Sequence, residues 1–256
     1  MRETEYDTMR AVENRHWWYA TLHRLVQHAL VDQLPPRGHV LDAGCGTGGM
    51  LAFLRERIRY LDFAGVDISE QAVQHCWRRG LTTVRQGTVH EMPFDAGDFD
   101  AVLCLDLLYH TAVEEERALA EISRVLRPGG LLVLNLPAFD CLRGSHDAAV
   151  CGSRRYKACH VRLLLERHNL QVEMIHYWNA WLFLPLLVWR RWSRRNATTG
   201  TSDVKLPASW LNGLLTRAGR LDVWLCRTFH LPFGSSVFAV ARKQHLPMGG
   251  SSNDGC

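Results

Sequence analysis

The chain has 256 residues, a formal net charge of +4, 47% hydrophobic and 22% charged residues. This length and composition allow one globular α/β domain with a proper core and added segments, while the mild charge without a basic stripe argues against a nucleic-acid partner. The eight cysteines include no C-x-x-C pair, which indicates free, reduced thiols of a cytoplasmic protein and not a disulfide framework or a metal site.

The first 36 residues are expected to form a helical lid. The N-terminus, MRETEYDTMR, lacks the apolar core of a signal peptide, which also favours a cytoplasmic protein. A helix is predicted over 8–33 and ends before Pro35 and Pro36. It carries an aromatic run: His16, Trp17, Trp18 and Tyr19. Adjacent helical residues point about 100° apart, so one or two of these rings should pack on the sheet and another should cover a pocket.

Strands and helices alternate through 37–140, the predicted cofactor-binding core. The expected strands are 39–43, 61–66, 81–86, 99–105 and 130–136, and the expected helices are 48–58, 69–79 and 114–126. With two later strands this pattern predicts a doubly wound, mostly parallel, seven-stranded sheet. Ligands of such sheets bind beyond the carboxyl ends of the strands.

A glycine-rich turn follows the first strand, in the sequence HVLDAGCGTG at 39–48. The next strand ends at Asp67, whose carboxylate is placed to accept ribose hydroxyls, as in nucleotide-ended cofactor sites. The glycines read G-x-G-x-G-G and lack the third glycine of a dinucleotide fingerprint. Asp42 inside the turn would repel a pyrophosphate, whereas it suits an ammonium group. The motif therefore argues against a nucleotide-dependent oxidoreductase, which remains an alternative.

Residues after 140 are less regular. We expect one domain over 1–245, with a substrate-side loop, helix and strand over 141–179 (helix 157–168, strand 170–178), a helical insertion over 180–230, the last strand within 231–245 and a disordered tail over 246–256.

The insertion begins with the apolar run WLFLPLLVW at 181–189, followed by RRWSRR. The run is too short to span a bilayer and contains Pro185. Its tryptophans and arginines resemble an interfacial helix, so contact with a membrane surface through 181–195 is one interpretation. We favour packing against a second helix at 208–229. A homodimer interface or a pocket for an apolar acceptor would use the same surface.

The string D-A-G-C-G-T-G resembles the first motif of class I S-adenosylmethionine-dependent methyltransferases. The segments 86–110 and 121–139 are similar to the later motifs of the same family, in the right order and spacing. The resemblance covers 39–140 closely. It extends more loosely through 15–19 and 146–156 to the bacterial type 11 small-molecule methyltransferases.

The resemblance implies a set of residues that bind S-adenosylmethionine and its product S-adenosylhomocysteine: Asp42, Gly44, Cys45, Gly46, Thr47, Gly48, Asp67, Ile68, Thr88, Val89, Leu105 and Asp106. Asp42 would lie near the ammonium group, Asp67 would bind both ribose hydroxyls and Ile68 would pack on the adenine face. An aspartate often accepts the adenine amino group where this chain has Thr88. A neutral hydroxyl accepts less strongly than a charged oxygen.

Methyl transfer needs a positioned acceptor more than a catalytic triad. His110 is the candidate base, because it follows strand 99–105 and has a suitable unperturbed pKa, although it would equally pack the start of the next helix. His146 beside Asp147 is the rival. Expected acceptor contacts are His16, Trp17, Trp18, Tyr19, Asp147, Arg155 and Tyr156.

The expected reaction is methylation of an O or N atom, or of a C atom, in a small apolar or aromatic acceptor that is natural-product-like or lipid-like. A non-catalytic cofactor-binding module is a further alternative.

Overall fold

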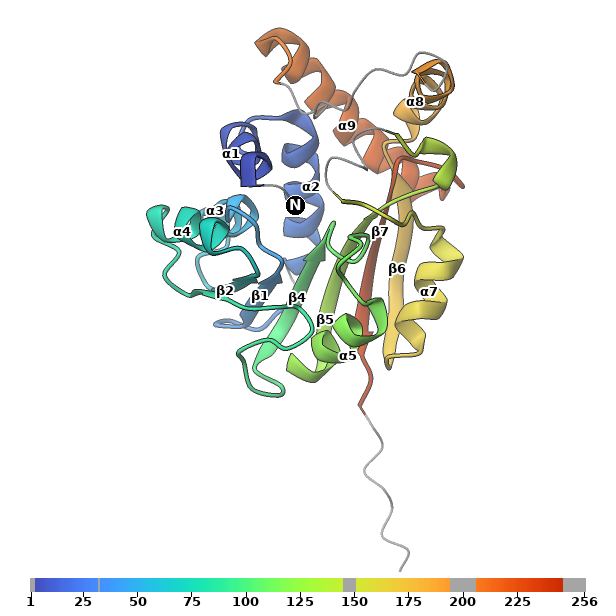
Figure 1. Cartoon of the computed structure of the whole chain (residues 1–256). Helices are drawn as coiled ribbons and strands as arrows, with labels where there is room; N and C mark the ends of the chain where they lie inside the picture. Colours follow the sequence, from blue (N-terminus) through green and yellow to red (C-terminus); the bar gives the residue numbers. More distant parts are fainter. Residues whose placement is uncertain (1–2, 32, 145–150, 194–205, 246–256) are drawn as a thin grey trace, which may run out of the picture.

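The computed structural model describes residues 3–31, 33–144, 151–193 and 206–245 (Figure 1). Seven strands form one sheet: β1 (His39–Ala43), β2 (Asp62–Asp67), β3 (Val84–Gln86), β4 (Phe99–Leu105), β5 (Leu126–Pro137), β6 (Leu170–Trp178) and β7 (Ser236–Lys243). Their order is β3-β2-β1-β4-β5-β7-β6, and only β7 runs antiparallel to its neighbours. The predicted mostly parallel sheet is confirmed.

Helices cover both faces of the sheet. One face packs against α5 (Glu115–Val125) and α7 (Ala158–Glu166), and the other packs against α2 (Trp17–Leu30), α3 (Gly49–Arg57) and α4 (Glu70–Arg78). Ser69 caps α4, because its Oγ accepts a hydrogen bond from the Ala72 N–H at 3.3 Å. This two-sided cover is the doubly wound arrangement that the alternation of strands and helices predicts.

The middle residues of the central strands are mostly apolar because both faces of these strands are buried. Along β4, Val102 and Cys104 join the core beneath α5, while Ala101 and Leu103 join the core beneath α2. Successive side chains of a strand point to opposite faces, so a strand covered on both sides has no solvent-facing position for a polar residue.

The N-terminal segment differs from the single helix predicted over 8–33. It forms two helices, α1 (Glu3–Val12) and α2, separated by a turn at 13–16. His16 caps α2 through its Nδ1 atom, which accepts from the Trp18 N–H at 3.3 Å. The break turns α1 away from the sheet face and over the carboxyl ends of the strands (Figure 1).

Strand β5 also begins earlier than predicted. The helix before it ends at Val125, as the sequence R-P-G-G indicates, but Leu126 already pairs with Phe99 of β4. The pairing then shifts, so that Leu131 lies opposite Ala101. The turn residues are therefore a bulge within the strand and not a loop before it.

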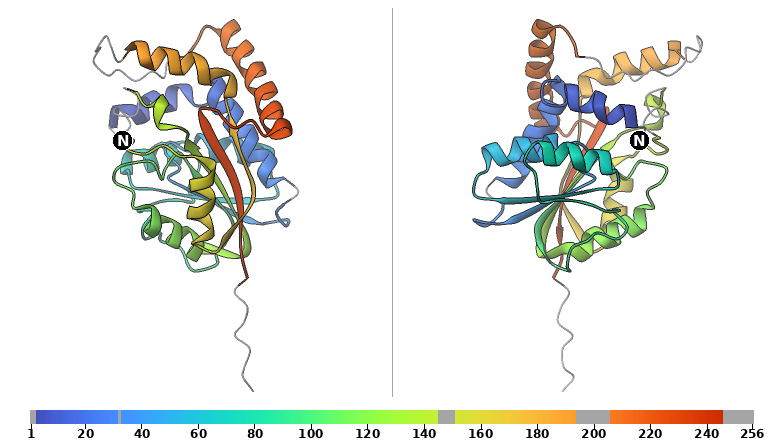
Figure 2. Two further views of the ribbon diagram at one scale, coloured as in Figure 1. Left: turned by 90° about the vertical axis from the view of Figure 1, so that its right-hand side faces the viewer. Right: turned by 60° about the vertical axis from the view of Figure 1, so that its left-hand side comes forward.

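The insertion forms α8 (Ala180–Ser193) and α9 (Ser209–Phe229), which rise above the carboxyl edge of the sheet and diverge from each other (Figure 2). Asp222 of α9 accepts from the backbone N–H groups of Asn179 at 2.5 Å and Trp181 at 3.2 Å, which holds the start of α8. Within the described ranges, no helix is long and apolar enough to cross a membrane.

Removing one side chain from the doubly covered sheet should measure how much the core stabilises it. Leu103 is 0% exposed in the centre of β4. We expect Leu103→Ala to lower the free energy of unfolding by about 2–5 kcal/mol, since it leaves a cavity between two packed layers. The measurement is urea denaturation followed by circular dichroism. Leu163→Ala, at a position of α7 that is 55% exposed, should cost less than about 1 kcal/mol; equal losses would contradict the packing described here.

Candidate functional site

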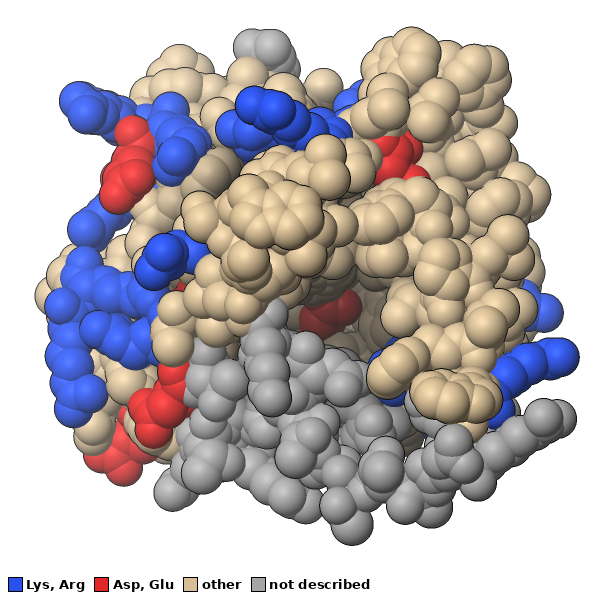
Figure 3. Space-filling model, turned by 90° about the horizontal axis from the view of Figure 1, so that it is seen from above, with Lys and Arg blue, Asp and Glu red and all other residues tan. Residues whose placement is uncertain are grey.

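A cavity of about 610 Å³ opens at the carboxyl edge of the sheet. It is bounded below by the ends of β1, β2 and β4, on one side by α1 and α2, and on the other by α8. Seen from above, this end of the molecule is hollowed, with acidic atoms at the base of the hollow (Figure 3). The cavity therefore lies where the parallel topology places ligands.

The glycine-rich turn after β1 is the floor of the cavity. Gly44 and Gly46 have positive φ angles of +78° and +53°. A Cβ atom on Gly44 would lie 2.8 Å from Leu107, and one on Gly46 would lie 2.6 Å from Met9. The Gly44 N–H donates to the carbonyl of Val66 at 2.8 Å and pins the turn to β2. Only glycine fits at these positions, and its bare backbone is presented to the cavity.

Asp67, at the end of β2, is bound by three donors. Its Oδ2 accepts from the Gly46 N–H at 2.8 Å, and its Oδ1 accepts from the Ser69 N–H at 2.9 Å and from the Tyr6 hydroxyl at 3.3 Å. Burial raises the pKa of this carboxyl, and these donors oppose the rise. The Tyr6 hydroxyl thus occupies an acceptor position that a ribose would also use.

Asp42 lies at the end of β1, 3% exposed, and lines the cavity. Among the described residues, no donor makes a hydrogen bond to its carboxylate. Burial, followed by the charges of Asp67 and Glu13, raises its pKa to about 7. A cationic ligand would reverse this shift, so the site fits an ammonium group better than a phosphate.

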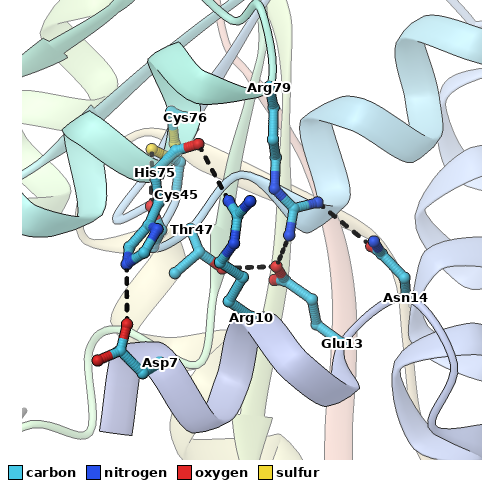
Figure 4. A network of polar contacts seen from close by, with 10 residues as sticks. Asp7, Arg10, Glu13, Asn14, Cys45, Thr47, His75, Cys76 and Arg79 are labelled. Carbon is cyan, nitrogen blue, oxygen red and sulfur yellow. Dashed lines mark hydrogen bonds and ion pairs between the residues drawn. The ribbon is translucent and has the colours of Figure 1, made fainter. Parts of the chain in front are cut away.

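Helix α1 is anchored on the turn by a polar network (Figure 4). Glu13, 4% exposed, accepts from the Thr47 hydroxyl at 2.6 Å and forms an ion pair with Arg79 of α4. In the middle of α1, Asp7 contacts the His75 imidazole at 3.1 Å. No pattern in the sequence indicated these contacts, because their partners lie 34 to 68 positions apart.

Two residues predicted to touch the cofactor lie behind the turn. Thr47 is 0% exposed and bonds to Glu13, and Gly48 starts α3 with a φ of +80°, where a Cβ would lie 2.7 Å from Leu81. Neither lines the cavity. Gly44, Cys45 and Gly46 form the face of the turn that lines the cavity, and Thr47 and Gly48 pack on the opposite face.

The loop after β3 shapes the side of the cavity lined by Ile68, Thr88 and Val89. His90 also lines it, and sequence reasoning missed it. The His90 Nε2 accepts from the Glu114 N–H at 2.9 Å, so the proton is assigned to Nδ1, which then donates to the Thr88 Oγ1 at 3.2 Å. The His90 N–H donates to the same oxygen at 3.3 Å. Both lone pairs of Thr88 are then used, so its hydroxyl is left to donate into the cavity, where we had expected it to accept.

Asp106 follows β4 with a positive φ of +52° and lines the cavity beside Leu105. Its Oδ2 accepts from the Asn135 amide at 2.8 Å, and the Asn135 Oδ1 accepts from the Trp178 indole at 2.9 Å. Burial raises the Asp106 pKa to about 7, against the opposing effects of Asn135 and Arg155. This carboxylate is therefore held rigidly in a state that is easily protonated near neutral pH.

The residues predicted for acceptor binding are divided. His110 and Arg155 line the cavity, and the Arg155 guanidinium donates to the Ala138 carbonyl at 3.0 Å. Tyr156 does not line it: this side chain is 6% exposed in the core, and its hydroxyl bonds to Glu115 at 2.5 Å. The alternation of the 154–156 segment explains the difference, since consecutive extended residues point in opposite directions. His146 and Asp147 lie outside the described residues.

All four residues of the aromatic run, His16 to Tyr19, line the cavity. Trp18 stacks on Trp178 with ring centroids 5.6 Å apart, and Trp17 contacts Trp181 at 5.9 Å. Burial lowers the His16 pKa, and its Nδ1 is already used to cap α2. His16 is thus a neutral wall residue.

Helix α8 adds Leu182, Leu186 and Arg190 to the wall, which sequence reasoning did not assign. Their spacing of four residues places them on one helical face. This spacing was the feature of the sequence that could have identified them as wall residues.

Known proteins are similar to this chain in sequence and in fold. Residues 41–134 match the family model "Methyltransferase domain". A fatty-acid O-methyltransferase of Mycolicibacterium smegmatis is 36% identical over 108 residues, which is 40% of this chain and 39% of that protein. A phthiotriol/phenolphthiotriol dimycocerosates methyltransferase of Mycobacterium ulcerans is 37% identical over 114 residues, 43% of this chain and 40% of that protein. The matches thus span about two fifths of the length of these relatives.

A solved S-adenosylmethionine-dependent methyltransferase from Thermotoga maritima has the same fold, with a TM-score of 0.58 at 16% identity over 94% of this chain and 96% of that one. The glycine turn, Asp42 and Asp67 lie in the matched segment, whereas β6 and β7 lie outside it. Residues 41–134 therefore match a methyltransferase domain, and the chain has the fold of a solved S-adenosylmethionine-dependent methyltransferase.

The anchoring of α1 can be tested apart from any ligand. Glu13→Ala removes the bonds to Thr47 and Arg79, and we expect the free energy of opening of α1 to fall by about 1.5–3 kcal/mol, because both bonds involve a buried charge. Hydrogen exchange of the amides of α1, against those of β1, measures this. Glu56→Ala, at a side chain 76% exposed on α3, is the control and should leave exchange unchanged. Unaltered protection of α1 in Glu13→Ala would show that the network does not hold it.

Proposed function

We propose that this domain binds S-adenosylmethionine over the glycine turn and transfers its methyl group to an oxygen or nitrogen atom, or to a carbon atom, of a small lipid-like acceptor. One observation supports this most: a single cavity joins the acidic floor at Asp42 and Asp67 to a wall of aromatic and aliphatic side chains. Both reactants thus fit into one space.

The acidic floor suits the cofactor. The carboxylate of Asp42, which has no donor among the described residues, would receive the ammonium group. Asp67 would take ribose hydroxyls once the Tyr6 hydroxyl shares or leaves its Oδ1 atom. The hydroxyl of Thr88, whose lone pairs are both used, would donate to a ring nitrogen of adenine. When bound, S-adenosylmethionine supplies a methyl group already activated by its positively charged sulfur.

The wall suits an apolar acceptor. Trp17, Trp18, Leu182 and Leu186 surround it with hydrocarbon and exclude water. Arg155 and Arg190 give the same space cationic groups, which would orient a polar or acidic head. The names of the fatty-acid and phthiotriol relatives agree with an acceptor that is largely hydrocarbon.

The need for a base depends on the acceptor. A carboxylate is already a nucleophile at neutral pH, whereas an alcohol or a protonated amine must lose a proton. His110 and Asp106 both line the cavity, and the Asp106 pKa of about 7 suits proton transfer near neutral pH. We assign His110 as the base and Asp106, held by Asn135, as its rival.

Cofactor affinity should depend on pH through Asp42. The carboxyl has a pKa near 7 in the free protein, and a bound cation favours its charged form, so binding below that pH releases a proton. We expect the affinity for S-adenosylhomocysteine to rise between pH 5.5 and 7.5, by at most about tenfold per pH unit, and then to level off. Asp42→Asn should bind weakly and lose this rise. Isothermal titration calorimetry measures both, with Asp140→Asn, at a side chain 73% exposed, as the control. A rise that persists in Asp42→Asn would exclude Asp42 as its source.

Turnover should separate the two candidate bases. With long-chain alcohol or amine acceptors we expect His110→Ala to lower kcat by about 10²–10⁴-fold, and with fatty acids only slightly, because a carboxylate needs no base. Affinity for S-adenosylhomocysteine should be unchanged. Methyl transfer from radiolabelled S-adenosylmethionine measures the rates. A loss confined to Asp106→Asn would move the role to Asp106, and no loss in either variant would mean that the site works by positioning alone.

A further inference from the structure

The outer faces of α8 and α9 carry large apolar side chains that nothing in the described part of the chain covers. Trp189 and Trp192 of α8 are 53% and 61% exposed, and Trp210 and Trp224 of α9 are 73% and 57% exposed. We call these faces, together with Leu184 and Val188, the outer helix surface. Single exposed apolar residues are ordinary, but several tryptophans gathered on one end of a protein indicate an interaction site.

The structure does not support our preference for α8 packed along α9. The two helices diverge from a common base, where Asp222 holds the start of α8 (Figure 2). Beyond this base each helix has apolar side chains that face outwards, such as Val188, 68% exposed, and Leu221, 58% exposed. The outer helix surface therefore needs a partner outside these two helices.

The charges on the two helices identify the kind of partner. Besides Arg190, which lines the cavity, the described residues of α8 and α9 include four arginines: Arg191, Arg217, Arg220 and Arg227. Their one acidic residue, Asp222, is 5% exposed and serves as the cap. A second copy of this surface would bring like charges together, whereas an anionic surface complements them and accommodates tryptophan at its apolar boundary.

The same helix separates this surface from the cavity. Leu182 and Leu186 line the cavity, while Leu184 and Val188, each two positions further along, are exposed. Two positions correspond to about 200° around an α-helix, so these pairs lie on opposite faces. Helix α8 thus has an inner face toward the cavity and an outer face toward solvent.

The outer helix surface is fixed relative to the cavity rim. The side chain of Asn212 on α9 accepts from the Trp17 N–H at 2.9 Å and donates to the Arg15 carbonyl at 2.7 Å. Trp17 also packs against Trp181 of α8. A surface bound by α8 and α9 would therefore lie at a defined orientation to the aromatic wall.

We propose that the outer helix surface binds an anionic membrane surface peripherally and places the mouth of the cavity against the lipid from which the acceptor enters. The entry of the acceptor rests on the proposed function, whereas membrane binding does not. Tryptophans would insert at the level of the headgroups and the arginines would contact lipid phosphates. Such binding is peripheral, since no helix in the described part of the chain is long and apolar enough to cross a bilayer.

Vesicle flotation without cofactor or acceptor tests the binding. We expect the full chain to float with vesicles of phosphatidylcholine and phosphatidylglycerol, and much less with phosphatidylcholine alone. Trp189→Ala/Trp192→Ala should reduce the partition coefficient about tenfold, and Arg191→Glu should reduce it about fivefold or more. The controls are Trp77→Ala, at a residue 52% exposed on α4, and Arg117→Glu, at a side chain 61% exposed on α5; both should float as the parent chain does.

Absence of flotation with the anionic vesicles, or equal losses in the controls, would overturn the proposal. So would a dimer, seen by sedimentation velocity, that Trp189→Ala/Trp192→Ala dissociates while vesicle binding is absent. Methyl transfer to a water-soluble acceptor is measured separately. If methyl transfer fails while flotation persists, the proposed function is wrong and membrane binding stands. If methyl transfer occurs while flotation fails, the proposed function stands and membrane binding is wrong.

Discussion

Three buried carboxylates around one glycine turn are the constraint on which the site depends. Asp42, Asp67 and Glu13 are all less than 10% exposed. A buried charge is costly unless donors or cations surround it. Asp67 has three donors, and Glu13 has the Thr47 hydroxyl and Arg79. Asp42 has none among the described residues, and its raised pKa reflects this deficit. The fold therefore has a buried carboxyl whose charged form a bound cation would stabilise.

The compensation of these charges also explains the N-terminal architecture. A continuous helix over 8–33 would have kept Glu13 on the side of α2, away from the turn. The break at 13–16 brings Glu13 to Thr47 and Arg79, and it brings Tyr6 to Asp67. The lid is therefore positioned by the acidic floor, and a ligand that changes the charge of the floor acts directly on the contacts that hold α1.

The predictable part of the molecule is the part governed by local patterns. Strands 99–105 and 170–178 were predicted to the residue, because apolar runs between turn signals depend on neighbours in sequence. Asp42 and Asp67 were found by their spacing from the glycines. The Trp178–Asn135–Asp106 chain was not, since its members are 29 and 43 positions apart and share no period. Tyr156 was misplaced for a related reason: the extended segment 152–156 pairs with residues distant in sequence, and this pairing decides which of its side chains faces inwards.

The acceptor half of the cavity is built differently from the cofactor half. Buried charge organises the floor proposed for the cofactor, and Asp42 and Asp67 of that floor lie in the matched segment. The acceptor wall comes from α2 and α8, whose contacts are mostly ring packing and helix caps, such as Trp18 on Trp178 and Asp222 on the start of α8. Packing of this kind tolerates changes of side chain as long as volume is kept. The acceptor wall can therefore vary while the acidic floor stays the same, and the helix that forms the wall is also the one whose outer face is exposed. Under the two proposals, the inner side of α8 would contact the acceptor and its outer side would face the lipid surface from which the acceptor comes.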